Sequence, residues 1–235
     1  MIEIATGVRR PAREGWIALS YFGLYLAYLF AARESELLHW ITLVALPLAL
    51  AVVLLPRGER GLGAALASVG LRRGHLMRGV GWAVAFGVAF GLFQAFFSSR
   101  AEEIQALVRS GRALWMYPLT FLLMMLLAGF TEEFFFRGFL QTRVEALLRS
   151  RWAAVLVVAL LFGVYHLPYA YFNPNWPSAG DWGAAWAAAL GNGVPGGLVL
   201  GVLYVKSRHN LLACMVLHSL INAAWAMTIL KTGSG

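Results

Sequence analysis

Long apolar runs alternate along the chain with short polar clusters, and this pattern predicts membrane-spanning helices. A spanning helix needs about 20 apolar residues, and we predict spans at about 16–31, 37–55, 76–98, 113–148, 151–167, 184–206 and 210–230. The fourth run is too long for one crossing and could break near Gly129, and the sixth begins weakly enough for a re-entrant piece. We therefore expect an all-α fold, a polytopic transmembrane helix bundle of about seven to eight membrane helices.

The rest of the chain shows no sign of a separate soluble domain. Residues 62–73 and 101–110 are amphipathic and are expected to lie along the membrane interface. The N-terminus lacks the apolar region and cleavage site of a signal peptide, so the first run is expected to be a retained span. We expect one integral-membrane domain over residues 1–235, with its chemistry at about 113–230.

Composition supports the membrane class and argues against nucleic acid as a partner. Hydrophobic residues make up 60% of the chain and charged residues 13%, whereas soluble domains average about 45–50% and about 25%. The net charge of +8 comes from short basic clusters between apolar runs, not from a basic helix face. The single cysteine, Cys214, excludes an intrachain disulfide and is expected to be a packing residue.

The placement of the basic residues predicts an orientation. With seven spans and the N-terminus inside, thirteen of the nineteen Lys and Arg residues fall on the inner side and five on the outer, with Arg137 inside a helix. Cytoplasmic loops carry an excess of Lys and Arg, so we expect a cytoplasmic N-terminus.

Glycines recur at a spacing of four residues, at Gly87 and Gly91 and again at Gly193, Gly197 and Gly201. Small residues at this period let helix backbones approach closely in lipid, where no hydrophobic effect drives helices together. We interpret these glycines as packing positions.

The segment TEEFFFRGFLQ, 131–141, brings three charges to an otherwise apolar run. Glu133 and Arg137 are four apart, so in a helix they share a face and can pair. Glu132 points about 100° away from Glu133 and must face another partner. Because an unpaired carboxylate at membrane depth is costly, Glu132 is a candidate functional residue.

A partner for Glu132 follows from the hairpin expected around residues 149–151. Glu132 and His166 both lie about 16 residues from this turn, so they sit at the same level of two antiparallel helices, roughly 24 Å from the turn at 1.5 Å per residue. Pro168 is expected to help end the second helix. The segment 167–182 that follows then predicts an interfacial loop that covers the site, or an aromatic belt at the membrane surface.

A third motif, HSLIN, places His218 and Asn222 on one helix face. Two chemistries suit these residues together with Glu132 and His166. In the first, Glu132 and His166 activate a water while His218 and Asn222 stabilise an oxyanion. In the second, Glu132, His166 and His218 hold zinc, although the usual HExxH signature is absent.

Other mechanisms and functions fit less well. Ser219 and its neighbour His218 point in different directions, no Gly-x-Ser-x-Gly elbow occurs, and Asp181 is the only aspartate, so serine and aspartyl proteases are excluded. Buried charges also form proton relays in transporters, which often show paired repeats with broken helices; this chain offers only one weak candidate, around Gly191–Gly197. An immunity or scaffold protein that lost its activity is a further alternative.

In this order and spacing, the motifs EEFFFR, FGVYH and HSLIN resemble the CPBP family, the type II CAAX prenyl endopeptidases and their bacterial relatives, also called Abi proteins. The resemblance covers roughly the C-terminal half. It implies an intramembrane endopeptidase of the glutamic type, with zinc possible. The residues that it implies for the water and the oxyanion hole are Glu132, His166, His218 and Asn222, with Glu133, Arg137 and Phe162 as structural support.

The resemblance also implies a partner, a membrane-bound peptide or protein. Its eukaryotic members cleave after a prenylated cysteine, while bacterial relatives act on other membrane-linked peptides. The compact chain, rich in Ala, Gly and Arg, leads us to expect a prokaryotic cytoplasmic membrane, where a prenylated substrate is an alternative that we do not favour.

Overall fold

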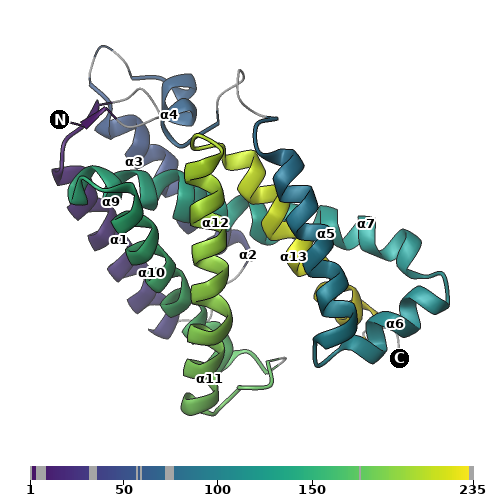
Figure 1. Ribbon diagram of the computed structural model, residues 1–235. Helices are drawn as coiled ribbons and strands as arrows, with labels where there is room; N and C mark the ends of the chain where they lie inside the picture. Colours follow the sequence, from purple (N-terminus) through teal and green to yellow (C-terminus); the bar gives the residue numbers. More distant parts are fainter. Residues whose placement is uncertain are drawn as a thin grey trace.

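The chain forms a bundle of helices, as predicted (Figure 1). The computed structural model describes residues 2–3, 9–31, 36–56, 58, 60–71, 77–174 and 176–232. Within them, six helices are long and apolar enough to cross a membrane: Leu37–Leu54, Val80–Phe97, Ala113–Leu148, Arg151–Phe172, Trp182–Lys206 and Leu211–Leu230. The other predicted span, 16–31, forms the 19-residue helix α1 (Arg13–Ala31), which is not among the six.

Several of these helices change locally between α and π geometry. In chain order the elements, with η for π-helix, are β1 (Ile2–Glu3), β2 (Arg9–Arg10), α1 (Arg13–Ala31), α2 (Glu36–Trp40), η1 (Ile41–Ala45), α3 (Leu46–Leu54), α4 (Leu62–Ser68), α5 (Val80–Phe97), α6 (Ala101–Arg109), α7 (Ala113–Met124), η4 (Met125–Phe130), α8 (Thr131–Glu133), η5 (Phe134–Gln141), α9 (Thr142–Leu148), α10 (Arg151–Phe172), α11 (Trp182–Ala188), η6 (Ala189–Gly193), α12 (Val194–Lys206) and α13 (Leu211–Thr232). The two short strands pair antiparallel.

Of the alternatives open for the fourth and sixth runs, the structure shows the unbroken helix in both cases. Residues Ala113–Leu148, which we call the motif helix, form one continuous helix, and so do Trp182–Lys206. Both contain π-helical segments, which fit an extra residue into the helix without interrupting it. Gly129 is a point of close approach instead, because a Cβ built there would collide with the Ser219 Oγ atom.

The prediction that the helix ends near Pro168 is wrong. Helix α10 continues through this buried proline to Phe172, so the connection to α11 is confined to the nine residues 173–181. Membrane helices tolerate proline where neighbouring structure satisfies the freed backbone groups. The shorter connection is fixed to the helix, since the Ser178 hydroxyl donates a hydrogen bond to the Ala170 carbonyl at 2.8 Å.

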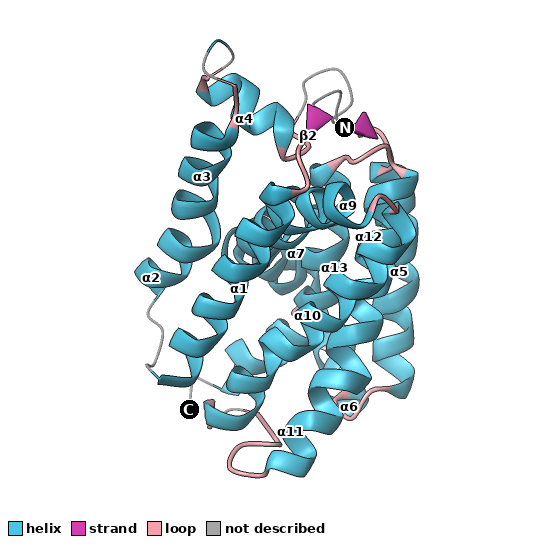
Figure 2. Ribbon diagram, turned by 90° about the vertical axis from the view of Figure 1, so that its left-hand side faces the viewer, coloured by secondary structure: helices cyan, strands magenta, loops and turns pink. Residues whose placement is uncertain are grey.

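Two groups of helices meet at the motif helix (Figures 1 and 2). Helix α13 packs against α5 and α7, whereas α10 packs against α12 and η6, and α1 lies along α9. Helix α6 buries Ile104 and Leu107 against this bundle and keeps Glu102 exposed, as the amphipathic pattern of 101–110 predicts. Of the other predicted interfacial segment, residues 62–68 form α4, and 72–73 lie outside the described residues.

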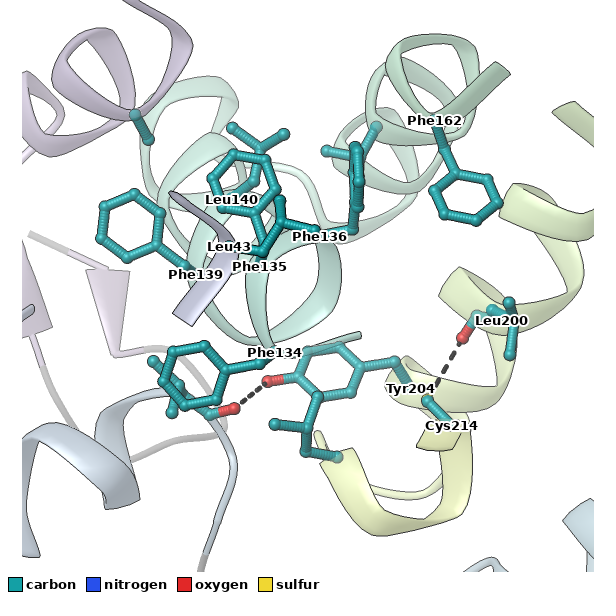
Figure 3. Close-up of a cluster of buried hydrophobic side chains, with 14 of the residues drawn as sticks. Leu43, Phe134, Phe135, Phe136, Phe139, Leu140, Phe162, Leu200, Tyr204 and Cys214 are labelled. Atoms are coloured by element: carbon teal, nitrogen blue, oxygen red, sulfur yellow. Dashed lines mark hydrogen bonds between the residues drawn. The ribbon is translucent and has the colours of Figure 1, made fainter. Parts of the chain in front are cut away.

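Aromatic side chains pack around the centre of the motif helix. Figure 3 shows Phe134, Phe136 and Phe139 pointing in different directions from η5, with Phe162 across from them on α10. The Phe136 and Phe162 rings meet edge to face at 4.9 Å, a geometry that aromatic pairs prefer. All four side chains are buried, so the helix that carries the charged motif is fixed on several sides.

The glycine spacing of four produces the close contact between α12 and α10. A Cβ built on Gly193 would lie 2.8 Å from the Gly163 Cα atom, and one on Gly197 would lie 2.8 Å from the Ala159 Cα atom. Real side chains essentially never come this near to backbone, so only glycine permits this helix separation. The packing role expected for this stripe is confirmed.

We predict that Gly197→Ala lowers the free energy of unfolding by about 1–3 kcal/mol, because the added methyl group must push α12 away from α10. Gly196→Ala is the matched control, since a Cβ there meets no atom of the described residues within 4 Å. Alanine favours helix over glycine, so the control is expected to be neutral or up to about 1 kcal/mol more stable. Thermal unfolding of both variants in detergent checks this, and equal behaviour of the two would contradict the packing role.

Candidate active site

The two glutamates of the motif helix lie on a very short α-helical stretch. Segment α8 contains only Thr131, Glu132 and Glu133, between the π-helical segments η4 and η5. Insertions of π-helix inside α-helices occur frequently at functional sites. Every residue from 131 to 146 is buried, so these charges lie inside the bundle and not at its surface.

Glu133 forms the pair with Arg137 that the spacing predicts. The Arg137 Nη1 atom donates to the Glu133 Oε1 atom at 2.8 Å, and both side chains are fully buried. The guanidinium also donates to the Gly197 carbonyl at 3.2 Å and lies over the Phe162 ring, 4.3 Å from its centroid. Arg137 therefore ties the motif helix to α10 and α12 as well as neutralising Glu133.

Glu132 faces two histidines from different helices. Its Oε2 atom lies 3.9 Å from the His166 Nε2 atom on α10 and 3.9 Å from the His218 Nε2 atom on α13. The same oxygen is buried and has no hydrogen-bond partner among the residues that the structure describes. Glu132 and His166 thus lie at the same level of their two helices, as the hairpin predicts. His218 reaches the same glutamate oxygen from α13.

The other nitrogen of each histidine fixes how the ring points. The His166 Nδ1 atom lies 2.7 Å from the Phe162 carbonyl, and the His218 Nδ1 atom lies 2.7 Å from the Glu133 Oε1 atom. Both partners can only accept a hydrogen bond, so each Nδ1 carries the proton and donates. In a neutral ring, Nε2 then presents its lone pair to Glu132.

Asn222 is half-buried and lies one helical turn beyond His218 on α13. Residues four apart in a helix share a face. Asn222 forms no hydrogen bond with the described part of the chain. The described residues therefore leave the donors of its amide group unused.

Two histidines and a glutamate also suggest a zinc site. These ligand types occur in catalytic zinc sites, where bonds of about 2.0–2.2 Å place neighbouring donors roughly 3.3 Å apart. The distances of 3.9 Å are wider. Among the described residues, no group of three His, Cys, Asp or Glu side chains is arranged to hold a metal ion. The donor atoms therefore lie farther apart than those of a zinc site, and we derive no step through a metal.

Sequence reasoning missed two features of this site. It assigned Glu133 to Arg137 alone, whereas Glu133 also holds His218, 85 residues away. It also overlooked His39, whose Nε2 atom lies 3.0 Å from the Thr131 Oγ1 atom. A histidine at the start of an apolar span was the available signal. Ser219 donates to the Met215 carbonyl at 2.7 Å, so its hydroxyl is engaged within its own helix.

Comparison with known proteins agrees with the motifs. Residues 114–224 match the family described as Type II CAAX prenyl endopeptidase Rce1-like. This matched segment contains all four candidate residues, Glu132, His166, His218 and Asn222. Neither the curated proteins nor the solved structures give a significant match. The family resemblance drawn from the three motifs is confirmed.

Proposed function

Because the chain belongs, through residues 114–224, to the family of Rce1-like type II CAAX prenyl endopeptidases, we propose that it hydrolyses a peptide bond of a membrane-associated substrate with a water activated by Glu132 and His166. The observation that carries this proposal is the convergence of the Glu132 Oε2 atom and two histidine Nε2 atoms inside a membrane helix bundle. The expected activity is that of an intramembrane endopeptidase.

The distances support a water at this point. A separation of 3.9 Å between the Glu132 and His166 acceptors is too long for a direct hydrogen bond, and it suits one water that donates to both. The Glu132 side chain is 11% exposed and that of His166 21% exposed, whereas the side chains of Glu133 and Arg137 are fully buried. The working carboxylate is therefore the accessible one of the two.

The proposed reaction begins when the water oxygen attacks the carbonyl carbon of the scissile bond and its proton passes to the Glu132 Oε2 atom. The carbonyl π electrons move to oxygen, and the resulting oxyanion accepts hydrogen bonds from His218 Nε2–H and Asn222 Nδ2–H. The tetrahedral intermediate then collapses and the C–N bond breaks. The leaving nitrogen takes the proton from Glu132, which restores the carboxylate.

Donation by His218 requires a proton on both ring nitrogens, since Nδ1 already donates to Glu133. The buried charges support this state. Two carboxylates, Glu132 and Glu133, are then balanced by Arg137 and the His218 imidazolium, and buried charges need such pairing. Glu133 thus serves the proposed oxyanion hole by holding His218 in its orientation and charge state.

We propose that the substrate is anchored in the bilayer by a lipid or a membrane-spanning tail, because the site lies on helices long and apolar enough to span it. The basic residues between the spans support a cytoplasmic N-terminus in a prokaryotic inner membrane. We extend the proposal to both prenylated and unprenylated peptides.

The test uses purified protein in detergent or liposomes with a panel of prenylated, acylated and transmembrane-tailed peptides, each with and without a strong chelator. We expect at least one peptide to be cut at the same rate in both conditions, with products identified by mass spectrometry. Loss of cleavage with the chelator would transfer the mechanism to zinc. A folded protein that cuts no peptide would contradict the protease proposal and favour a transporter or scaffold.

A further inference from the structure

The N-terminal half of the chain touches the motif helix immediately before Glu132. His39 lies on α2, and its Nε2 atom is 3.0 Å from the Thr131 Oγ1 atom. Next to it, Trp40 stacks on Phe130 with ring centroids 5.4 Å apart and an interplanar angle of 24°. Two consecutive residues of α2 thus hold two consecutive residues of the motif helix, from outside the 114–224 match.

The direction of the histidine hydrogen bond follows from the threonine. The Thr131 hydroxyl has one proton, and it donates this proton to the Leu127 carbonyl at 2.8 Å. Its oxygen can then only accept from His39, so Nε2 of this ring carries a proton. The contact is half-buried and lies inside the helix bundle, where hydrogen bonds compete less with water.

The local backbone explains why such a contact matters. Thr131 begins the three-residue segment α8, where the helix passes from the π geometry of η4 back to α before η5. The π-helix η1, which follows Trp40 directly, packs against both α8 and η5. At such a junction the helical register is set by few bonds, and an external contact at Thr131 fixes the direction in which the next residue points.

We propose that His39 is a positioning residue that holds the Thr131–Glu132 backbone so that the Glu132 carboxylate faces both His166 and His218. The expected effect on kcat rests on the proposed function. The expected effect on the backbone around Thr131 rests on the contacts alone. A misplacement of about 1 Å can cost about 100-fold in rate, and the 3.9 Å distances from the Glu132 oxygen to the two rings leave little room for displacement.

The test compares full-length wild type with His39→Phe, which keeps a ring and loses the donor, and with Thr131→Val, which loses the acceptor. We expect each to lower kcat for the best-cut peptide by about 5–30-fold, below the 100-fold cost of a full misplacement, with KM within about two-fold. The double variant should fall no further, because both changes remove one bond. His39→Gln places an amide nitrogen near Nε2 and should recover most of the rate. Leu37→Ala, at a 70% exposed side chain on the same helix, is the control.

A second measurement does not depend on activity. Backbone hydrogen exchange of the same proteins in detergent is expected to be several-fold faster over residues 125–134 in His39→Phe and Thr131→Val, and unchanged in His39→Gln. A hydrogen-exchange rate over residues 125–134 that is the same in His39→Phe as in wild type would overturn the contact between His39 and Thr131. Faster exchange with wild-type kcat, or additive losses in the double variant, would overturn the positioning role while leaving the protease proposal intact. If wild type and Glu132→Gln are equally inactive on every peptide, the protease proposal and the positioning role that rests on it both fail.

Discussion

Glu132→Gln is expected to lower the rate of peptide cleavage by about 10³-fold or more at saturating substrate. General base catalysis contributes typically about 10²–10⁴-fold, and glutamine fills the same space without taking a proton from water. Because Glu132 forms no ion pair within direct hydrogen-bonding distance of any residue that the structure describes, we expect the unfolding temperature of the variant to stay close to that of wild type. The measurement is kcat by quantitative mass spectrometry of the products, beside a thermal unfolding curve.

The control for this prediction is Glu102→Gln, which removes an exposed glutamate of α6 far along the chain from the motif. It changes the net charge of the protein by the same amount and should leave kcat within about two-fold, since surface substitutions away from a site act weakly. A Glu132→Gln variant that still cuts at more than a tenth of the wild-type rate would remove this residue as the base.

Arg137→Met is expected to lower the free energy of unfolding by about 3–5 kcal/mol, the second large effect. The change leaves the Glu133 carboxylate fully buried without its principal cation, and breaking a buried pair from one side costs about this much. It also removes the donor to the Gly197 carbonyl. Unfolding in detergent by heat or denaturant measures the loss.

Two comparisons sharpen this second prediction. The double variant Glu133→Gln with Arg137→Met removes both charges and should recover about 1–2 kcal/mol of the loss, because no uncompensated charge remains. Arg109→Met removes an exposed arginine whose one hydrogen bond within the described part of the chain goes to Gln105, at 3.3 Å, so it should cost under about 1 kcal/mol. Equal losses in Arg109→Met and Arg137→Met would contradict the structural role of the buried pair.

The features that the sequence predicted well depend on local geometry. Glu133 and Arg137 pair because residues four apart in a helix always share a face. Glu132 meets the level of His166 because a short turn joins two antiparallel helices, so counting from the turn fixes the register. The spacing of Gly193 and Gly197 predicted close packing for the same reason.

The features that it did not predict depend on how distant segments come together. Nothing in HSLIN says that His218 reaches Glu133 as well as Glu132, since this contact joins residues 85 apart through the packing of α13 on the motif helix. The bonding of His39 to Thr131, 92 residues away, needs the same knowledge. The prediction that Pro168 ends its helix was wrong because neighbouring helices in a membrane bundle can satisfy the backbone groups that a proline leaves free.

The central claim is that Glu132 activates a water that attacks the peptide bond directly. The most direct measurement is a single-turnover reaction of wild type and Glu132→Gln in ¹⁸O-labelled water with chelator present, in which product and protein masses are both followed in time. We predict one ¹⁸O atom in the new carboxyl group, no covalent peptide adduct on the protein, and product from Glu132→Gln that forms at least about 10³-fold more slowly than from wild type. A transient adduct on the protein, or labelled product that the glutamine variant forms at more than a tenth of the wild-type rate, would contradict the account.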